Sequence, residues 1–187
     1  MTTKNFDDDD FVNLDVFSDD FPDAQSIFIA ELDDTMQEKL TGTKWEARIG
    51  MLNEDTPWQE RIALYQLLRA DEMFPAEACY FLLVWAIESM AQERIDELYN
   101  AQYAVRVDKI RQIHGLAENE GWEPGEGPVE FQELETEFSQ AVDAILRASY
   151  QFVGEHEIAD LIENDPDEAQ RRYNEGNEFF EKLFYEE

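Results

Sequence analysis

The chain has 187 residues, a length that suits one domain and can bury a hydrophobic core. Apolar residues make up 43% of it and aromatic residues 13%, which is more than disordered acidic chains carry, so most of it should fold. Because 45 Asp and Glu face 14 Lys and Arg, the formal net charge is -31. A charge of this sign disfavours direct binding to nucleic acid or to an anionic membrane.

The first 22 residues mix aspartates with apolar side chains and show no helical stripe. This composition is typical of disordered segments, and we predict a flexible acidic tail over residues 1–22. Val12, Leu14 and Val16 alternate at period two, which would also suit a short strand paired with residues 26–32. Residues 11–32 thus stay open between a helix, a hairpin and a disordered tail. Aspartates at 7–10, where a secretory signal needs positive charge, favour a cytoplasmic location.

Two helices are predicted in the next part of the chain. The first begins near Asp23 and ends before Gly42, and the second begins at the capping signature of Thr56, Pro57 and Gln59. Their apolar faces are formed by Phe28, Leu32, Met36 and Leu40 in the first helix, and by Trp58, Ile62, Tyr65 and Leu68 in the second.

One long helix is predicted after Pro75, because no Gly or Pro interrupts the pattern before Gly115. A helix of up to about 38 residues exceeds the usual length, so we expect a bend in it. The apolar run from Cys79 to Ile87 is far shorter than the about 20 residues of a membrane span, and it predicts the centre of the core. Cys79 is the only cysteine and is expected to be a buried, reduced thiol. The stripe of the long helix consists of Val84, Ile87, Ala91, Ile95, Leu98 and Val105.

Residues 115–128 hold four glycines and two prolines and are predicted to form a loop and an internal boundary. A helix with an apolar seam follows and is broken at Gly154. A short helix and a last helix, capped by Asp165, Pro166 and Glu168, complete the chain. The predicted fold is an all-α bundle of five or six helices within a single helical domain, residues 23–187. The two seams comprise Phe131, Leu134, Phe138, Ala141, Ile145, Ala148 and Phe152, then Ala169, Tyr173, Gly176, Phe180 and Leu183.

No catalytic residue can be assigned from the sequence. The ligand histidine of a carboxylate-bridged di-iron bundle follows a Glu by three residues, whereas Arg111 and Val153 precede His114 and His156 at that distance. The sequence also contains no nucleophile elbow, no P-loop and no dinucleotide-binding glycine turn.

Four carboxylates form a pattern that is compatible with a metal site. Glu130 and Glu133 are followed by Glu157 and Asp160, and residues three apart share one face of a helix. This E-x-x-E and E-x-x-D order, carried by residues 130–160, resembles the motif of the all-α nucleoside triphosphate pyrophosphohydrolases of the MazG type. The resemblance implies a Mg²⁺ ion held by these four residues against the phosphates of a nucleotide.

The acidic residues are concentrated in segments, since 28 of the 45 lie in three stretches without Lys or Arg. We therefore predict a non-enzymatic interaction protein that binds a basic protein, with Glu130, Glu133, Glu135 and Glu137 as its contact residues and no cofactor. One form of this prediction is a nucleic-acid mimic, which would occupy a nucleic-acid-binding protein. The alternatives are the Mg²⁺-dependent hydrolase and a salt-adapted domain of another purpose.

A homodimer is a further option, because aromatic residues crowd the last turns of the chain. Burial of these residues in the protein's own core is the favoured interpretation. They are Phe179, Phe180, Phe184 and Tyr185.

Overall fold

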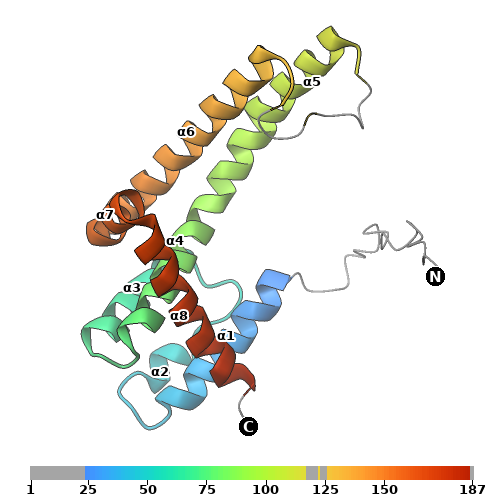
Figure 1. Ribbon diagram of the computed structural model, residues 1–187. Coiled ribbons are helices and arrows are strands. Elements are labelled where there is room, and N and C mark those ends of the chain that lie inside the picture. Colours follow the sequence, from blue (N-terminus) through green and yellow to red (C-terminus); the bar gives the residue numbers. More distant parts are fainter. Residues whose placement is uncertain (1–23, 117–121, 123–125, 186–187) are drawn as a thin grey trace, which may run out of the picture. The chain divides into compact units, whose positions relative to one another are not determined.

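The structure is a computed structural model that describes residues 24–116, 122 and 126–185. All regular elements in these ranges are helices, which confirms the predicted all-α class (Figure 1). The predicted tail, residues 1–22, and most of the predicted loop, residues 117–121 and 123–125, lie outside the described residues. Within the described ranges, no helix is long and apolar enough to cross a membrane.

The described residues form seven separate helices, one more than the largest number predicted, because α4, η1 and α5 join end to end. The additional helix is α2, whose four residues are too few to give a periodic apolar pattern in the sequence. The elements are α1 (Ala24–Leu40), α2 (Glu46–Ile49), α3 (Trp58–Ala70), α4 (Ala76–Leu98), η1 (Tyr99–Tyr103), α5 (Ala104–His114), α6 (Val129–Phe152), α7 (His156–Asn164) and α8 (Pro166–Tyr185).

Contacts within the chain divide it into two units, Met1–Glu54 and Asp55–Glu187. In the first unit α1 packs against α2, and the predicted residues Leu32, Met36 and Leu40 are buried. Because residues 26–32 belong to α1, a strand in this segment is wrong. The helix ends as predicted, since Gly42 follows it with a φ of +78°, a conformation that glycine adopts without steric cost. A single domain over 23–187 remains a prediction.

The core of the second unit forms around α4, whose first half is apolar on every side. Residues 78–84 of this helix are all buried, and α3, α6 and α8 all pack against α4. Cys79 is 1% exposed, as predicted for a buried thiol, and burial raises its pKa. The apolar run at 79–87 is therefore the centre of this core.

The contact between α4 and α8 depends on Gly176. A Cβ atom at this position would lie 2.2 Å from the carbonyl oxygen of Glu77 and 2.5 Å from Cβ of Phe81. The absence of a side chain therefore lets the two backbones approach closely. Further along α8, Phe180 is fully buried and packs against Phe74 and Phe81, with ring centroids 5.9 and 5.8 Å apart. This confirms burial in the protein's own core for Phe180; the side chain of Tyr185 lies outside the description.

The long helix runs from Ala76 to His114 as predicted, but its path is interrupted by one turn of π-helix, η1. Such a turn adds one residue, which rotates the following residues by about 100° around the helix axis. The side chains that face the interior are therefore Leu98 before this turn, and Tyr103 and Val107 at its end and after it. The predicted stripe residue Val105 is 45% exposed, so its assignment to the core is wrong.

Helix α6 follows α5 and lies alongside it (Figure 1). Phe131 and Leu134 are buried with Val107, as the predicted seam requires, while Phe152 at the other end is 75% exposed. Tyr150 is the buried residue at that end, because the helix there faces α4 and α7. The prediction that Phe152 belongs to the core is therefore wrong.

A buried carboxylate fixes the connection from α6 to α7. Glu155 is 5% exposed and accepts two hydrogen bonds from Arg69 of α3, at 2.9 and 2.7 Å. Gln66, also of α3, donates to Glu155 at 2.8 Å and to the carbonyl of Val153 at 2.9 Å. The turn at Gly154, which ends α6 as predicted, is thereby held against α3.

Candidate functional site

The structure does not bring together the four carboxylates of the predicted metal site. Glu130 and Glu133 lie in the first two turns of α6, and Glu157 and Asp160 lie in α7, beyond its opposite end (Figure 1). The nineteen residues of α6 that follow Glu133 span about 28 Å at 1.5 Å per residue. Among the described residues, no group of three or more potential ligands could hold a metal ion.

The four glutamates predicted to contact a partner do not form one row. Glu130, Glu133 and Glu137 are exposed and share one face of α6, as their spacing of three and four requires. Glu135 points to another side, is half-buried, and lines a pocket that also includes Arg111. The exposed row therefore consists of three residues.

Only one carboxylate of this row is neutralised by a described residue. Glu137 accepts a hydrogen bond from Arg106 of α5 at 2.5 Å, and both side chains are at least half exposed. Glu130 and Glu133 have no ion pair with any residue in the described ranges. The negative charge at the start of α6 is thus left for solvent ions or a binding partner.

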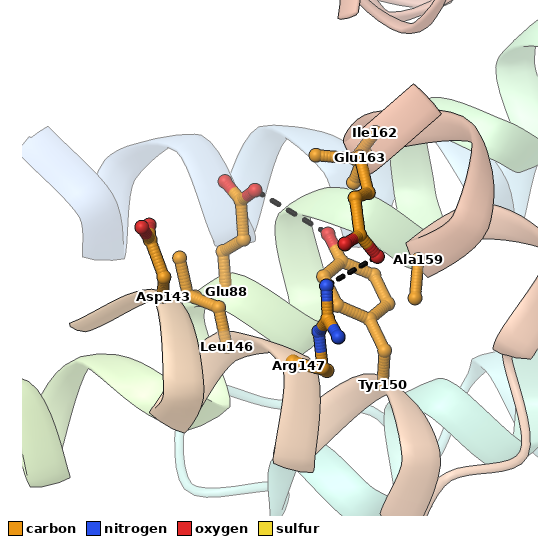
Figure 2. Close-up of a pocket in the computed structure, with 8 residues that line it drawn as sticks. All are labelled: Glu88, Asp143, Leu146, Arg147, Tyr150, Ala159, Ile162 and Glu163. Carbon is orange, nitrogen blue, oxygen red and sulfur yellow. Dashed lines mark hydrogen bonds and ion pairs between the residues drawn. The ribbon is translucent and has the colours of Figure 1, made fainter. Parts of the chain in front are cut away.

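A pocket of about 360 Å³ lies between α4, α6 and α7 (Figure 2). The carboxylate of Glu88 on α4 accepts a hydrogen bond from the hydroxyl of Tyr150 on α6 at 3.3 Å. Arg147 of α6 forms an ion pair with Glu163 of α7, and Asp143 lies one turn before Arg147. The remaining lining residues are Leu146, Ala159 and Ile162.

Desolvation shifts the pKa of the two groups that meet in this pocket, although only Tyr150 is buried and Glu88 is exposed. Desolvation raises the pKa of Glu88, and the hydrogen bond from Tyr150 opposes that shift. The pKa of Tyr150 is raised by desolvation first and by the neighbouring negative charge of Glu88 second. This shift favours the protonated hydroxyl of Tyr150, which is the form that donates the hydrogen bond to Glu88.

A second pocket, of about 350 Å³, adjoins the first, because Glu88 and Ile162 line both. Tyr80 of α4 and Tyr173 of α8 line it, together with Val84 and the start of α8. Desolvation raises the pKa of both tyrosines, and the charge of Glu88 adds to the shift in each. Glu88, which is exposed, therefore has three phenol groups nearby: Tyr150 donates a hydrogen bond to it, and Tyr80 and Tyr173 line the second pocket with it.

Sequence reasoning did not identify Glu88 or Tyr150 as site residues. Glu88 follows the apolar run of α4 directly, a position at which a polar residue also marks the ordinary end of a buried segment. Tyr150 lies off the predicted seam, and its burial depends on the approach of α4 and α7. A local pattern carries no signal for either.

Comparisons with protein-family models, curated proteins and solved structures found no match to this chain. The resemblance to MazG-type pyrophosphohydrolases therefore depends on the order of four carboxylates, of which two lie at the start of α6 and two lie in α7.

Proposed function

We propose that this protein binds a basic protein partner through the exposed carboxylates at the start of α6. The observation that carries the proposal is the pair Glu130 and Glu133, which are exposed and have no ion pair with a described residue. Arg106 of α5, which reaches this row, is already engaged by Glu137. A partner would therefore have to supply the positive charge.

Mimicry of nucleic acid is a narrower form of the proposal. Glu130, Glu133 and Glu137 follow each other along the axis at about 4.5 and 6 Å, given a rise of 1.5 Å per residue. A DNA duplex carries one charge per about 1.7 Å of axis. The row is therefore sparser than a duplex, which favours a partner with a few matching Lys or Arg residues over one that reads a whole backbone.

The proposal is tested by charge reversal at Glu130, Glu133, Glu135 and Glu137, each replaced by lysine. As a control, Asp167, Glu175, Glu178 and Glu181, all exposed on α8, are replaced in the same way and change the net charge equally. Basic proteins retained by the immobilised parent at 0.1 M salt are identified, purified and titrated against all three proteins. We expect the α6 variant to lose binding and the α8 variant to keep it.

Salt provides the second measurement, because the screening length falls from about 10 Å at 0.1 M to about 3 Å at 1 M. Binding through α6 should weaken steeply over this range. Equal losses in both variants would contradict a site on α6, and retention of no basic protein would leave the salt-adapted interpretation. Displacement of the partner by duplex DNA would favour mimicry of nucleic acid. Mg²⁺-dependent hydrolysis of nucleoside triphosphates by the parent protein would contradict the proposal and favour the hydrolase.

A further inference from the structure

The two pockets beside Glu88 have a negative balance that their own residues do not neutralise. Arg147 is the only Lys or Arg among the residues that line them, and it is paired with Glu163. Glu88 and Asp143 are the two carboxylates that remain, and the hydroxyl of Tyr150 supplies a hydrogen bond to Glu88 without neutralising its charge. A ligand with positive charge is therefore favoured over a neutral or anionic one.

The chemistry of the lining decides which kind of cation fits. Small metal ions prefer several oxygen ligands, and no group of three or more acidic, histidine or cysteine side chains in the described ranges could hold one. The lining instead offers the rings of Tyr80, Tyr150 and Tyr173, whose faces attract cations. The apolar side chains of Val84, Leu146 and Ile162 complete the surface. Aromatic faces with one carboxylate and an aliphatic wall suit an ammonium group on a hydrocarbon chain.

We propose that the adjoining pockets on the two sides of Glu88 bind a protonated aliphatic amine, with Glu88 as the counter-ion of its ammonium group. Its hydrocarbon chain lies along Ile162, which lines both pockets. A second ammonium group at the other end of a diamine meets Asp143 in the larger pocket. This inference is independent of the proposed partner site on α6, since Glu130 and Glu133 line neither of these two pockets.

The test is isothermal titration of the full chain with 1,4-diaminobutane at fixed ionic strength, with butane-1,4-diol as the uncharged counterpart. Glu88→Gln keeps the size of the side chain and removes its charge. Glu93→Gln removes one charge from the exposed surface of α4, outside both pockets, and serves as the matched control, because a strongly acidic protein also collects amines diffusely. We expect saturable one-to-one binding that is about tenfold weaker in Glu88→Gln, equivalent to about 1.4 kcal/mol, and unchanged in Glu93→Gln.

A second variant separates the aromatic contribution from the charge. Tyr173→Leu keeps an apolar side chain and removes a ring from the smaller pocket, and circular dichroism of each variant reports that the helices remain folded. We expect weaker diamine binding in this variant as well. Equal affinities for the parent and Glu88→Gln, binding without saturation, or equal heats with sodium or magnesium chloride would each overturn the proposal.

Discussion

Glu155 illustrates how much one side chain can contribute when it is removed from water and fully hydrogen-bonded. Its carboxylate is 5% exposed and accepts three hydrogen bonds from α3, whereas Arg69 on the other side of the pair is 43% exposed. Loss of the carboxylate leaves an arginine that can still reach water, so the cost should be smaller than for a fully buried pair. We expect Glu155→Ala to lower the free energy of unfolding by about 1–3 kcal/mol in urea titrations.

The matched control is Glu163→Ala, which breaks the ion pair with Arg147. Both of these side chains are 53% exposed, so the change should cost about 0–1 kcal/mol. Similar losses in the two variants would show that burial of Glu155 contributes no extra stability.

The raised pKa of Glu88 predicts that the stability of the fold changes with pH in the opposite direction to that expected from an ordinary paired carboxylate. Desolvation raises its pKa in the folded state, so the unfolded chain releases this proton at a lower pH. The contribution of Glu88 to stability is therefore full below the ordinary glutamate pKa and is lost as the pH rises through the raised value. The charged and titratable groups around it are Tyr80, Asp143, Arg147, Tyr150, Glu163 and Tyr173.

Replacement of Glu88 by Gln removes this titration and keeps the hydrogen-bond acceptor. We expect the difference in unfolding free energy, parent minus variant, to decline as the pH rises above the ordinary glutamate pKa. Glu93→Gln, on the same helix but outside both pockets, serves as the control. A difference that rises with pH would mean that the Tyr150 hydrogen bond outweighs desolvation.

At the scale of the elements, the π-turn η1 predicts that the same substitution has different effects on stability at Val105 and at Val107. Val107 is 6% exposed and packs with Phe131 and Leu134, whereas Val105 is 45% exposed. In an uninterrupted α-helix Val105 would continue the stripe of Leu98. We expect Val107→Ala to cost about 1–2 kcal/mol, since it removes two buried methyl groups, and Val105→Ala to cost less than about 0.5 kcal/mol.

Both values are measured by chemical denaturation under one set of conditions. A larger effect at Val105 than at Val107 would show that the helix continues through residues 99–103 without the extra residue.

Gly176 gives a second prediction at this scale, where two effects oppose each other. Alanine is favoured over glycine within a helix by about 1 kcal/mol, but its Cβ would meet the backbone of α4 at 2.2 Å. A backbone oxygen cannot rotate away, so α4 and α8 must move apart. We expect Gly176→Ala to lower the melting temperature, at a net cost of about 1–3 kcal/mol.

Asn174→Ala on the same helix is the control, because Asn174 is exposed and makes one surface hydrogen bond with Gln170. Its effect should stay within about 0.5 kcal/mol. An increase in stability with Gly176→Ala would mean that helix propensity outweighs the close approach.

The elements that the sequence predicted correctly are those specified by local signals. Gly42, Gly115 and Gly154 end helices with positive φ, and the side chain of Asp165 accepts the backbone N–H of Glu168 at 3.2 Å, as its capping signature predicts. The boundary at Thr56 was displaced by one residue, since α3 begins at Trp58 with Pro57 in the cap position. The phase of the helix was misassigned beyond η1 and at the end of α6, because both depend on contacts between elements.

The candidate site was harder to predict for the same reason. Glu130, Glu133 and Glu137 are exposed on one face of α6, as their spacing requires, and their contact with a partner stays a prediction. The pockets beside Glu88 require α4, α6, α7 and α8 to meet, and Glu88 is 62 residues from its hydrogen-bond partner Tyr150. The boundary predicted at the 115–128 loop stays a prediction, and the contacts add a division after Glu54 that no signal in the sequence indicated.

At the scale of the whole molecule, the net charge of -31 predicts that added salt stabilises the fold. The screening length falls from about 30 Å at 0.01 M salt to about 8 Å at 0.15 M, so self-repulsion should decrease most in this range. If this decrease raises the free energy of unfolding by on the order of 1 kcal/mol, the melting temperature rises by about 2–4 °C. Surface ion pairs such as Arg106–Glu137 would be weakened by the same salt, so a falling melting temperature would indicate that attraction dominates.

The solitary cysteine has a consequence for how the opening of this molecule can be followed. Cys79 lies at the centre of the core around α4, so a thiol reagent can modify it only in states that expose that core. The rate of modification then measures the free energy of those openings without any added label. Val107 lies in α5, whereas Cys79 lies near the start of α4. A destabilising change at Val107 would accelerate the modification of Cys79 if the second unit opens cooperatively. It would leave the rate unchanged if α5 and the start of α6 separate while the core stays closed.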